Sequence, residues 1–88
     1  MEIEIRRTFL NDVKKIKENR VKDDIKNFII KIKSVKNLQD ITNLKKLSGY
    51  KNYYRVKIKN YRVGLFFDND KLSIVRCLHR KEIYKFFP

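Results

Sequence analysis

Apolar positions along this chain change their period twice. Residues 2–6 alternate charged and apolar side chains, with Ile3 and Ile5 on one side, which predicts a short strand with one buried face. The spacing then becomes three and four residues, as in an amphipathic helix, and Thr8 is placed to cap that helix. The apolar residues of this first helix are Phe9, Val13 and Ile16.

A second helix is predicted to begin near Val21. Asp23 and Asp24 would lie in its first turn, where the helix dipole favours acidic side chains. We interpret its apolar stripe as core, because lysines occupy most of the remaining helix surface. The stripe consists of Val21, Ile25, Phe28, Ile29, Ile32 and Val35. The two helices are expected to form a hairpin that lies on a sheet.

Alternation with a period of two returns in the C-terminal half. Residues 37–52 mix Asn, Ser and Gly with a few leucines, and we interpret them as a connecting segment. Three strands are predicted after it, separated by tight turns at Asn60 and at 68–70. The last strand ends at His79, and residues 80–87 are expected to form a short helix.

The order of elements, β-α-α-β-β-β with a short C-terminal helix, predicts the α+β class. Residues 1–88 are expected to form one small domain, since a chain of this length does not comfortably make two. We expect one twisted antiparallel sheet that carries the two-helix hairpin on one face.

The charge of the chain adds a functional expectation. There are 23 Lys and Arg against 10 Asp and Glu, a formal net charge of +13. A polyanion is the natural partner of such a surface, because neutralising phosphates releases their condensed counterions. The alternative is that lysine enrichment only maintains solubility. The excess is larger after Lys45, so a basic binding face is expected in the C-terminal half.

The composition disfavours several kinds of site. The single cysteine, Cys77, excludes an internal disulfide and fits a reducing compartment. One His and one Cys cannot build a structural zinc site, no acidic cluster suits Mg²⁺, and two glycines make no phosphate-binding loop. No signal peptide or membrane span is evident. We therefore expect a cytoplasmic protein that uses no metal, cofactor or membrane.

Strand alternation predicts a cluster of cations on the uncovered face of the sheet. If Val56 faces the helices, Arg55 and Lys57 face away from them, and Arg62 of the next strand joins them. Cations placed this way lie roughly 5–8 Å apart, and their repulsion is destabilising. The cluster therefore indicates a binding function, with a solvated face of splayed charges as the alternative.

The segment from His79 to Tyr84 adds an imidazole, the guanidinium of Arg80 and a phenol. A phenol beside arginines ionises more easily, although Tyr84 taken alone would more simply pack beside Ile83. His79 suits either general acid–base chemistry or a structural hydrogen bond. The enzymatic option that survives is a metal-free nuclease, in which the 2′-OH of RNA attacks and cations stabilise the charge on phosphate.

The chain resembles the RelE/ParE superfamily of bacterial and archaeal toxins in motifs spread over its C-terminal half. These motifs are Gly49-Tyr50, YYRVKI at 53–58, NYRVG at 60–64 and LHRKEIY at 78–84. Each motif alone is weak, but together they are fairly specific, and the predicted order of elements also matches over the whole chain.

The resemblance implies a RelE-like toxin domain over residues 1–88, the toxin of a type II toxin–antitoxin system. RelE-type members enter the ribosomal A site and cut messenger RNA, and the attacking 2′-OH leaves a 2′,3′-cyclic end. The resemblance also implies a cognate RelB-like antitoxin as partner, and operator DNA bound through the toxin–antitoxin complex.

The family's basic and phenolic positions coincide with residues that alternation and local chemistry had selected. They are Arg55, Lys57, Arg62, Arg80 and Tyr84. RelE members tend to carry lysine where Arg55 stands, and an arginine is a poor general base because it stays protonated. The base is therefore left open between Tyr84, Lys57 and His79.

We expect Lys57 and Tyr84 to assist deprotonation of the 2′-OH, and Arg55 and Arg62 to hold the scissile phosphate. Arg80 would stabilise the phosphorane or protonate the leaving oxygen, helped by the neighbouring imidazole. The predicted catalytic residues are Lys57, Arg62, Arg80, Tyr84 and His79, and the predicted RNA-binding residues are Arg55, Lys59 and Lys81.

Two other functions stay compatible with the sequence. ParE-type relatives share the fold and act on DNA gyrase without cleaving RNA, but they generally lack the full basic set. A non-catalytic nucleic-acid-binding module would explain the charge alone.

Overall fold

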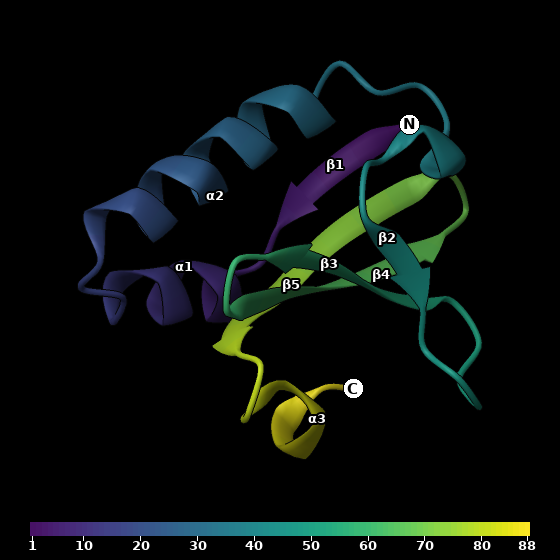
Figure 1. The fold of residues 1–88 in the computed structure, drawn as a ribbon. Coiled ribbons are helices and arrows are strands. Elements are labelled where there is room, and N and C mark those ends of the chain that lie inside the picture. Colours follow the sequence, from purple (N-terminus) through teal and green to yellow (C-terminus); the bar gives the residue numbers. More distant parts are fainter.

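The computed structural model describes residues 1–88 as a five-stranded sheet with helices on both of its faces (Figure 1). The strands are β1 (Glu2–Ile5), β2 (Leu44–Lys46), β3 (Tyr53–Ile58), β4 (Tyr61–Asp68) and β5 (Lys71–His79). The helices are α1 (Arg7–Lys14), α2 (Asn19–Ile32) and α3 (Ile83–Phe86), with a 3-10 turn at Leu38–Asp40. The strand order is β1-β5-β4-β3-β2. The predicted α+β class is confirmed.

The sheet differs from the prediction in two respects. β1 pairs with β5 in parallel, with Ile3 opposite Leu72, so the sheet is mixed and not wholly antiparallel. Only strands joined by short turns are obliged to be antiparallel, and most of the chain separates β1 from β5. The segment 37–52 also contains β2, which pairs with β3. A strand of three residues is too short for alternation to reveal it.

The main core lies between the sheet and the α1–α2 hairpin. Val21, Ile25 and Ile32 of α2 are buried, which confirms that the predicted stripe is core. Val56 and Val63 face them from the sheet, so alternation identified the covered face correctly. The remaining buried members of this core are Phe9, Ile16, Ile41, Leu65, Leu72, Ile74 and Cys77.

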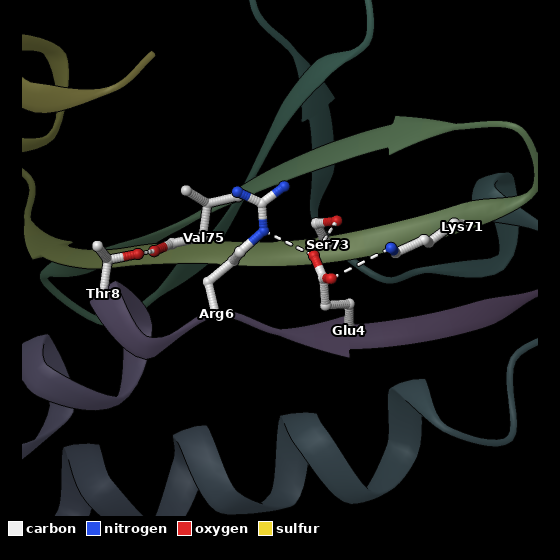
Figure 2. Close-up of polar contacts among 6 residues, drawn as sticks. All are labelled: Glu4, Arg6, Thr8, Lys71, Ser73 and Val75. Atoms are coloured by element: carbon white, nitrogen blue, oxygen red, sulfur yellow. Dashed lines mark hydrogen bonds and ion pairs between the residues drawn. The ribbon is translucent and has the colours of Figure 1, made fainter.

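The hairpin begins earlier than predicted. Arg6 occupies the N-cap position of α1, and the hydroxyl of Thr8 donates instead to the carbonyl of Val75 on β5 (Figure 2). In α2 the helix starts at Asn19, so Asp23 and Asp24 lie beyond its first turn. Thr8 is therefore a link between helix and sheet, and its predicted capping role is wrong.

Side chains of α1 replace a missing strand beside β5. β1 ends opposite Ile74, so the following stretch of β5 has no strand partner on that side. Thr8 binds the Val75 carbonyl there, and the carboxylate of Asp12 accepts the Cys77 N–H at 3.0 Å. Asp12 also accepts from Arg76 at 2.7 Å. Backbone groups of β5, among them the buried N–H of Cys77, are thereby satisfied where the sheet narrows.

A second, smaller core lies on the opposite face of the sheet. Ile83 and Phe87 of the C-terminal segment pack there with Leu47, so that α3 covers part of the face that α1 and α2 leave open (Figure 1). No helix of the chain has the length and apolar character needed to cross a membrane.

Candidate functional site

Cations from β3 and β4 converge on the sheet face that bears α3. Lys57 lies directly opposite Arg62, and Arg55 precedes Lys57 by two residues on the same strand. Their neighbours Val56 and Val63 are buried in the main core on the other face. The structure thus brings together the three cations that alternation had placed on one surface.

The C-terminal segment adds Arg80 and Tyr84 to this group. The Arg80 N–H donates to the Asn60 carbonyl at 2.7 Å, which holds the segment against the β3–β4 turn. Burial and then the positive charge of Arg55 and Arg80 lower the pKa of Arg62, while Tyr84 acts in the opposite direction. These side chains are therefore close enough to influence one another electrostatically. We call Arg55, Lys57, Arg62, Arg80 and Tyr84 the cationic cluster.

No carboxylate neutralises the cationic cluster. The six ion pairs of the chain include none of its four cations. The Arg62 guanidinium is instead held by two backbone carbonyls, those of Lys59 at 3.0 Å and Tyr61 at 2.9 Å. The positive charge of the cluster is therefore not compensated by an ion pair, and Tyr84, 62% exposed, lies open to solvent beside it.

A glycine allows α3 to lie this close to the sheet. A Cβ atom at Gly64 would come within 2.8 Å of the Phe87 ring, so only glycine leaves room for that ring. Tyr53 flanks the same ring at a centroid distance of 5.5 Å, and Phe66 packs on Tyr53 at 4.9 Å. Phe66 is therefore part of an aromatic cluster under the C-terminal segment.

Three of the predicted site residues lie elsewhere. His79 is opposite Tyr61, with the two rings 5.5 Å apart, and Tyr61 packs against the main core. Lys59 forms an ion pair with Asp24 of α2 at 2.9 Å, again on the helix-covered side. Lys81 is exposed in the turn after β5, where its N–H donates to the His79 imidazole. None of the three joins the cationic cluster in this structure.

Sequence reasoning missed Lys45, which lies on β2 directly opposite Arg55. This cross-strand pairing extends the row of cations by one strand. The missed strand hid it, because without β2 no alternation argument could assign a face to Lys45. Asp12 was missed as well, since its carboxylate meets Arg76 only through the tertiary fold.

The cationic cluster contains no acidic side chain. No group of three or more His, Cys, Asp or Glu side chains lies close enough together to hold one. Burial raises the pKa of the Cys77 thiol to about 12, and this residue is in the main core, away from the cluster. The functional groups that the cluster itself provides are four cations and a phenol.

Known proteins are similar to this chain in sequence and in fold. Residues 3–84 match the family described as ParE toxin of type II toxin-antitoxin system, parDE. Toxin RelE3 of Methanocaldococcus jannaschii is 36% identical over 89 residues, and the alignment covers 100% of both chains.

Solved structures agree with the sequence matches. A chain of the RelB–RelE antitoxin–toxin complex from Methanococcus jannaschii superposes with a TM-score of 0.82 at 34% identity, covering 97% of this chain and 99% of that one. The RelBE2 complex from Mycobacterium tuberculosis gives a TM-score of 0.69 at 20% identity, over 90% and 96% of the two chains, which shows the fold alone. The chain therefore belongs to the RelE/ParE superfamily as a RelE-like member, the toxin of a type II toxin–antitoxin system.

Proposed function

We propose that this toxin is a metal-independent endoribonuclease that cleaves messenger RNA in the ribosomal A site. The single observation that carries the proposal is the cationic cluster itself. Lys57 and Arg62 form a cross-strand pair with Arg55 beside them, and no carboxylate neutralises the three. Cations at such spacing repel one another and destabilise the sheet, and a bound phosphodiester would offset this repulsion.

The proposed reaction needs only groups that RNA and the cluster provide. The 2′-OH loses its proton and its oxygen attacks the adjacent phosphorus. The bond to the 5′ oxygen breaks, that oxygen takes up a proton, and a 2′,3′-cyclic phosphate and a 5′-OH result. The intermediate phosphorane carries more negative charge than the starting diester, so fixed cations stabilise it more strongly than the substrate.

The residues divide these tasks by their chemistry. Arg55 and Arg62 hold the scissile phosphate, because a guanidinium binds phosphate oxygens in bidentate fashion and stays protonated. Arg80, which also lies near Arg62, stabilises the phosphorane and the leaving oxygen. Lys57 and Tyr84 are the groups able to exchange a proton with the 2′-OH. His79 has no part in this assignment, because it pairs with Tyr61 on the other face.

The partners follow from the family. RelB-type chains occur with the toxins in the complexes from Methanococcus jannaschii and Escherichia coli. We propose that a cognate RelB-like antitoxin binds this chain, that the complex binds operator DNA, and that the free toxin acts in the cytoplasm. An acidic antitoxin would complement the net charge of +13.

The test is cleavage mapping by primer extension in a translating extract. The wild-type protein should produce discrete breaks in the messenger, and Arg62→Ala or Arg80→Ala should lower the cleavage rate by roughly 10²–10³-fold. Lys17→Ala is the matched control, because it removes one exposed cation between α1 and α2. Equal cleavage by all four proteins, or none by the wild type, would overturn the proposal.

A second function is favoured by the family description, which names a ParE toxin. A ParE-like toxin would inhibit DNA gyrase, and purified protein would then block supercoiling without cutting RNA.

A non-catalytic nucleic-acid-binding module would behave differently again. In that case Arg62→Ala would weaken binding and reduce the salt slope by about one, with no cleavage to lose.

A further inference from the structure

A pocket of about 380 Å³ lies directly beside the cationic cluster, between α3 and the loop that joins β2 to β3. Arg55 and Tyr84 belong to both the cluster and the pocket lining. A chain whose phosphate binds the cluster therefore comes close to this pocket. The catalytic scheme leaves the rest of the pocket unused.

An aromatic side chain forms one wall of the pocket. Tyr50 lines it and is 52% exposed. Its other side is fixed by an edge-on contact with Tyr53, at a centroid distance of 6.3 Å. Tyr53 in turn packs on Phe87 in the small core. Tyr50 is thus an exposed ring on a rigid base.

The loop that carries Tyr50 is tightly turned. Gly49 adopts a φ of 81°, and the Tyr50 N–H donates to the Leu47 carbonyl at 3.4 Å. Leu47 itself is buried in the small core. The turn therefore sets where the Tyr50 backbone lies, and the contact with Tyr53 orients its ring.

Positive charge borders the same pocket. Lys45 and Lys46 line it together with Arg55, and none of the three forms an ion pair. An exposed aromatic face beside unpaired cations suits a nucleotide, because the base stacks on the ring and the phosphate meets the cations. The loop and α3 line the pocket on two sides, and an unstacked base of a single strand has the free face that stacking on Tyr50 needs.

We propose that this pocket binds the nucleotide next to the scissile phosphate of single-stranded RNA, and that it sets the sequence preference of cleavage. Tyr50 stacks on the base, and Lys45 contacts the phosphate of that nucleotide. The inference rests on the proposed ribonuclease function and adds to it a subsite built by β2 and its loop.

The test measures binding separately from cleavage. The probe is a fluorescent single-stranded RNA whose 2′ positions carry O-methyl groups, so that it cannot be cut. Tyr50→Ala should weaken its binding by about 5-fold or more, whereas Tyr50→Phe should bind like the wild type, because stacking uses the ring. Lys45→Ala should reduce the salt slope by about one, and the distant Lys17→Ala should leave affinity at fixed salt nearly unchanged.

Cleavage mapping then tests the preference. Tyr50→Ala should cut the messenger at a different distribution of sites, while Tyr50→Phe keeps the wild-type distribution. Thermal unfolding of each variant excludes loss of the fold as the cause.

The outcomes separate this inference from the proposed function. If the wild type cuts RNA but Tyr50→Ala keeps full affinity and the same sites, the subsite is overturned and the nuclease stands. If Tyr50→Ala instead weakens only binding of the antitoxin, the pocket docks a protein and the inference is also overturned. If the wild type binds the probe through Tyr50 yet never cuts RNA, the proposed function falls and the cleavage preference with it, while the nucleotide-binding pocket itself stands.

Discussion

The two ends of one sheet face differ in whether their positively charged side chains have acidic partners. At the β1–β5 end, Glu4 accepts hydrogen bonds from Arg6 and Ser73 and pairs with Lys71 at 3.1 Å (Figure 2). At the β3–β4 end, Lys57 faces Arg62 with no acidic side chain in contact.

This difference in charge pairing distinguishes a surface that only keeps the protein soluble from one that binds a ligand. A face that needed only to be soluble could alternate charges throughout, as the Glu4 end does, because opposite charges across strands stabilise a sheet. The cationic cluster keeps its mutual repulsion instead. A bound polyanion would offset that repulsion, and this is the physical reason to place the proposed RNA site at the β3–β4 end of the face and not at the β1–β5 end.

Removing one cation of the cationic cluster should have the largest effect on messenger cleavage. We expect Lys57→Met to lower messenger cleavage by about 100-fold, since the group acts on the transferring proton and the phosphate charge. The same variant should unfold at an equal or slightly higher temperature, because a repulsive contact is lost. Cleavage rates and thermal unfolding measured on one preparation check both halves, and a large fall in stability would contradict this view of the cluster.

The Asp12–Arg76 pair provides a case where charge serves the fold. Asp12→Ala should destabilise the protein by about 2–3 kcal/mol, because the Cys77 N–H and the Arg76 guanidinium lose their acceptor. Asp12→Asn keeps an acceptor oxygen and should cost less. Urea unfolding measures the difference. Cleavage by the folded fraction should stay unchanged, and a loss of activity without a loss of stability would place Asp12 in the functional machinery.

The position of α3 is open to a test through Gly64. Gly64→Ala should cost about 1–3 kcal/mol, because the new methyl group overlaps the Phe87 ring and forces the C-terminal segment outward. Cleavage should fall with it, since that segment carries Arg80 and Tyr84. Phe87→Leu combined with Gly64→Ala should recover part of both losses. If the single substitution leaves activity intact, the activity does not depend on how the C-terminal segment packs against β4.

The smallest effect should come from acid titration at the other end of the face. Hydrogen bonds from Arg6, Lys71 and Ser73 lower the pKa of Glu4 from 4.5 to about 2. A lowered pKa stabilises the folded form above the unfolded value, and the contribution disappears as the pH falls through the folded value. The stability difference between wild type and Glu4→Gln should therefore be largest above pH 4.5 and vanish towards pH 2. A difference independent of pH would show that the Glu4 charge is not what matters.

Sequence periodicity predicted the covered face of the sheet because burial and alternation obey the same geometry. Once Val56 and Val63 were assigned to the core, Arg55, Lys57 and Arg62 had to lie on the other face. The terminal motif placed Arg80 and Tyr84 close to one another along the chain, but no local pattern indicated that Phe87, after α3, would lie over β4. That depends on the absence of a side chain at Gly64 and on the Phe87 ring that fills the space.

Lys59, His79 and Lys45 mark the limit of local reasoning. The sequence pattern of β3 predicts that Lys59 shares a face with Arg55 and Lys57. In the structure Lys59 lies in the turn with a φ of 50° and forms an ion pair with Asp24 of α2. His79 follows the register of β5, which sets it opposite Tyr61. Lys45 belongs to a strand that exists only because β3 offers it an edge.

The amino-acid sequence alone determined the class of fold, the face on which three cations gather and the family to which the chain belongs, because these depend on residue order and period. Tertiary structure decided the parallel pairing of β1, the addition of β2 and Lys45, and the approach of α3. Those features arise from contacts between residues far apart in the chain, and no local pattern encodes the distance at which such segments meet.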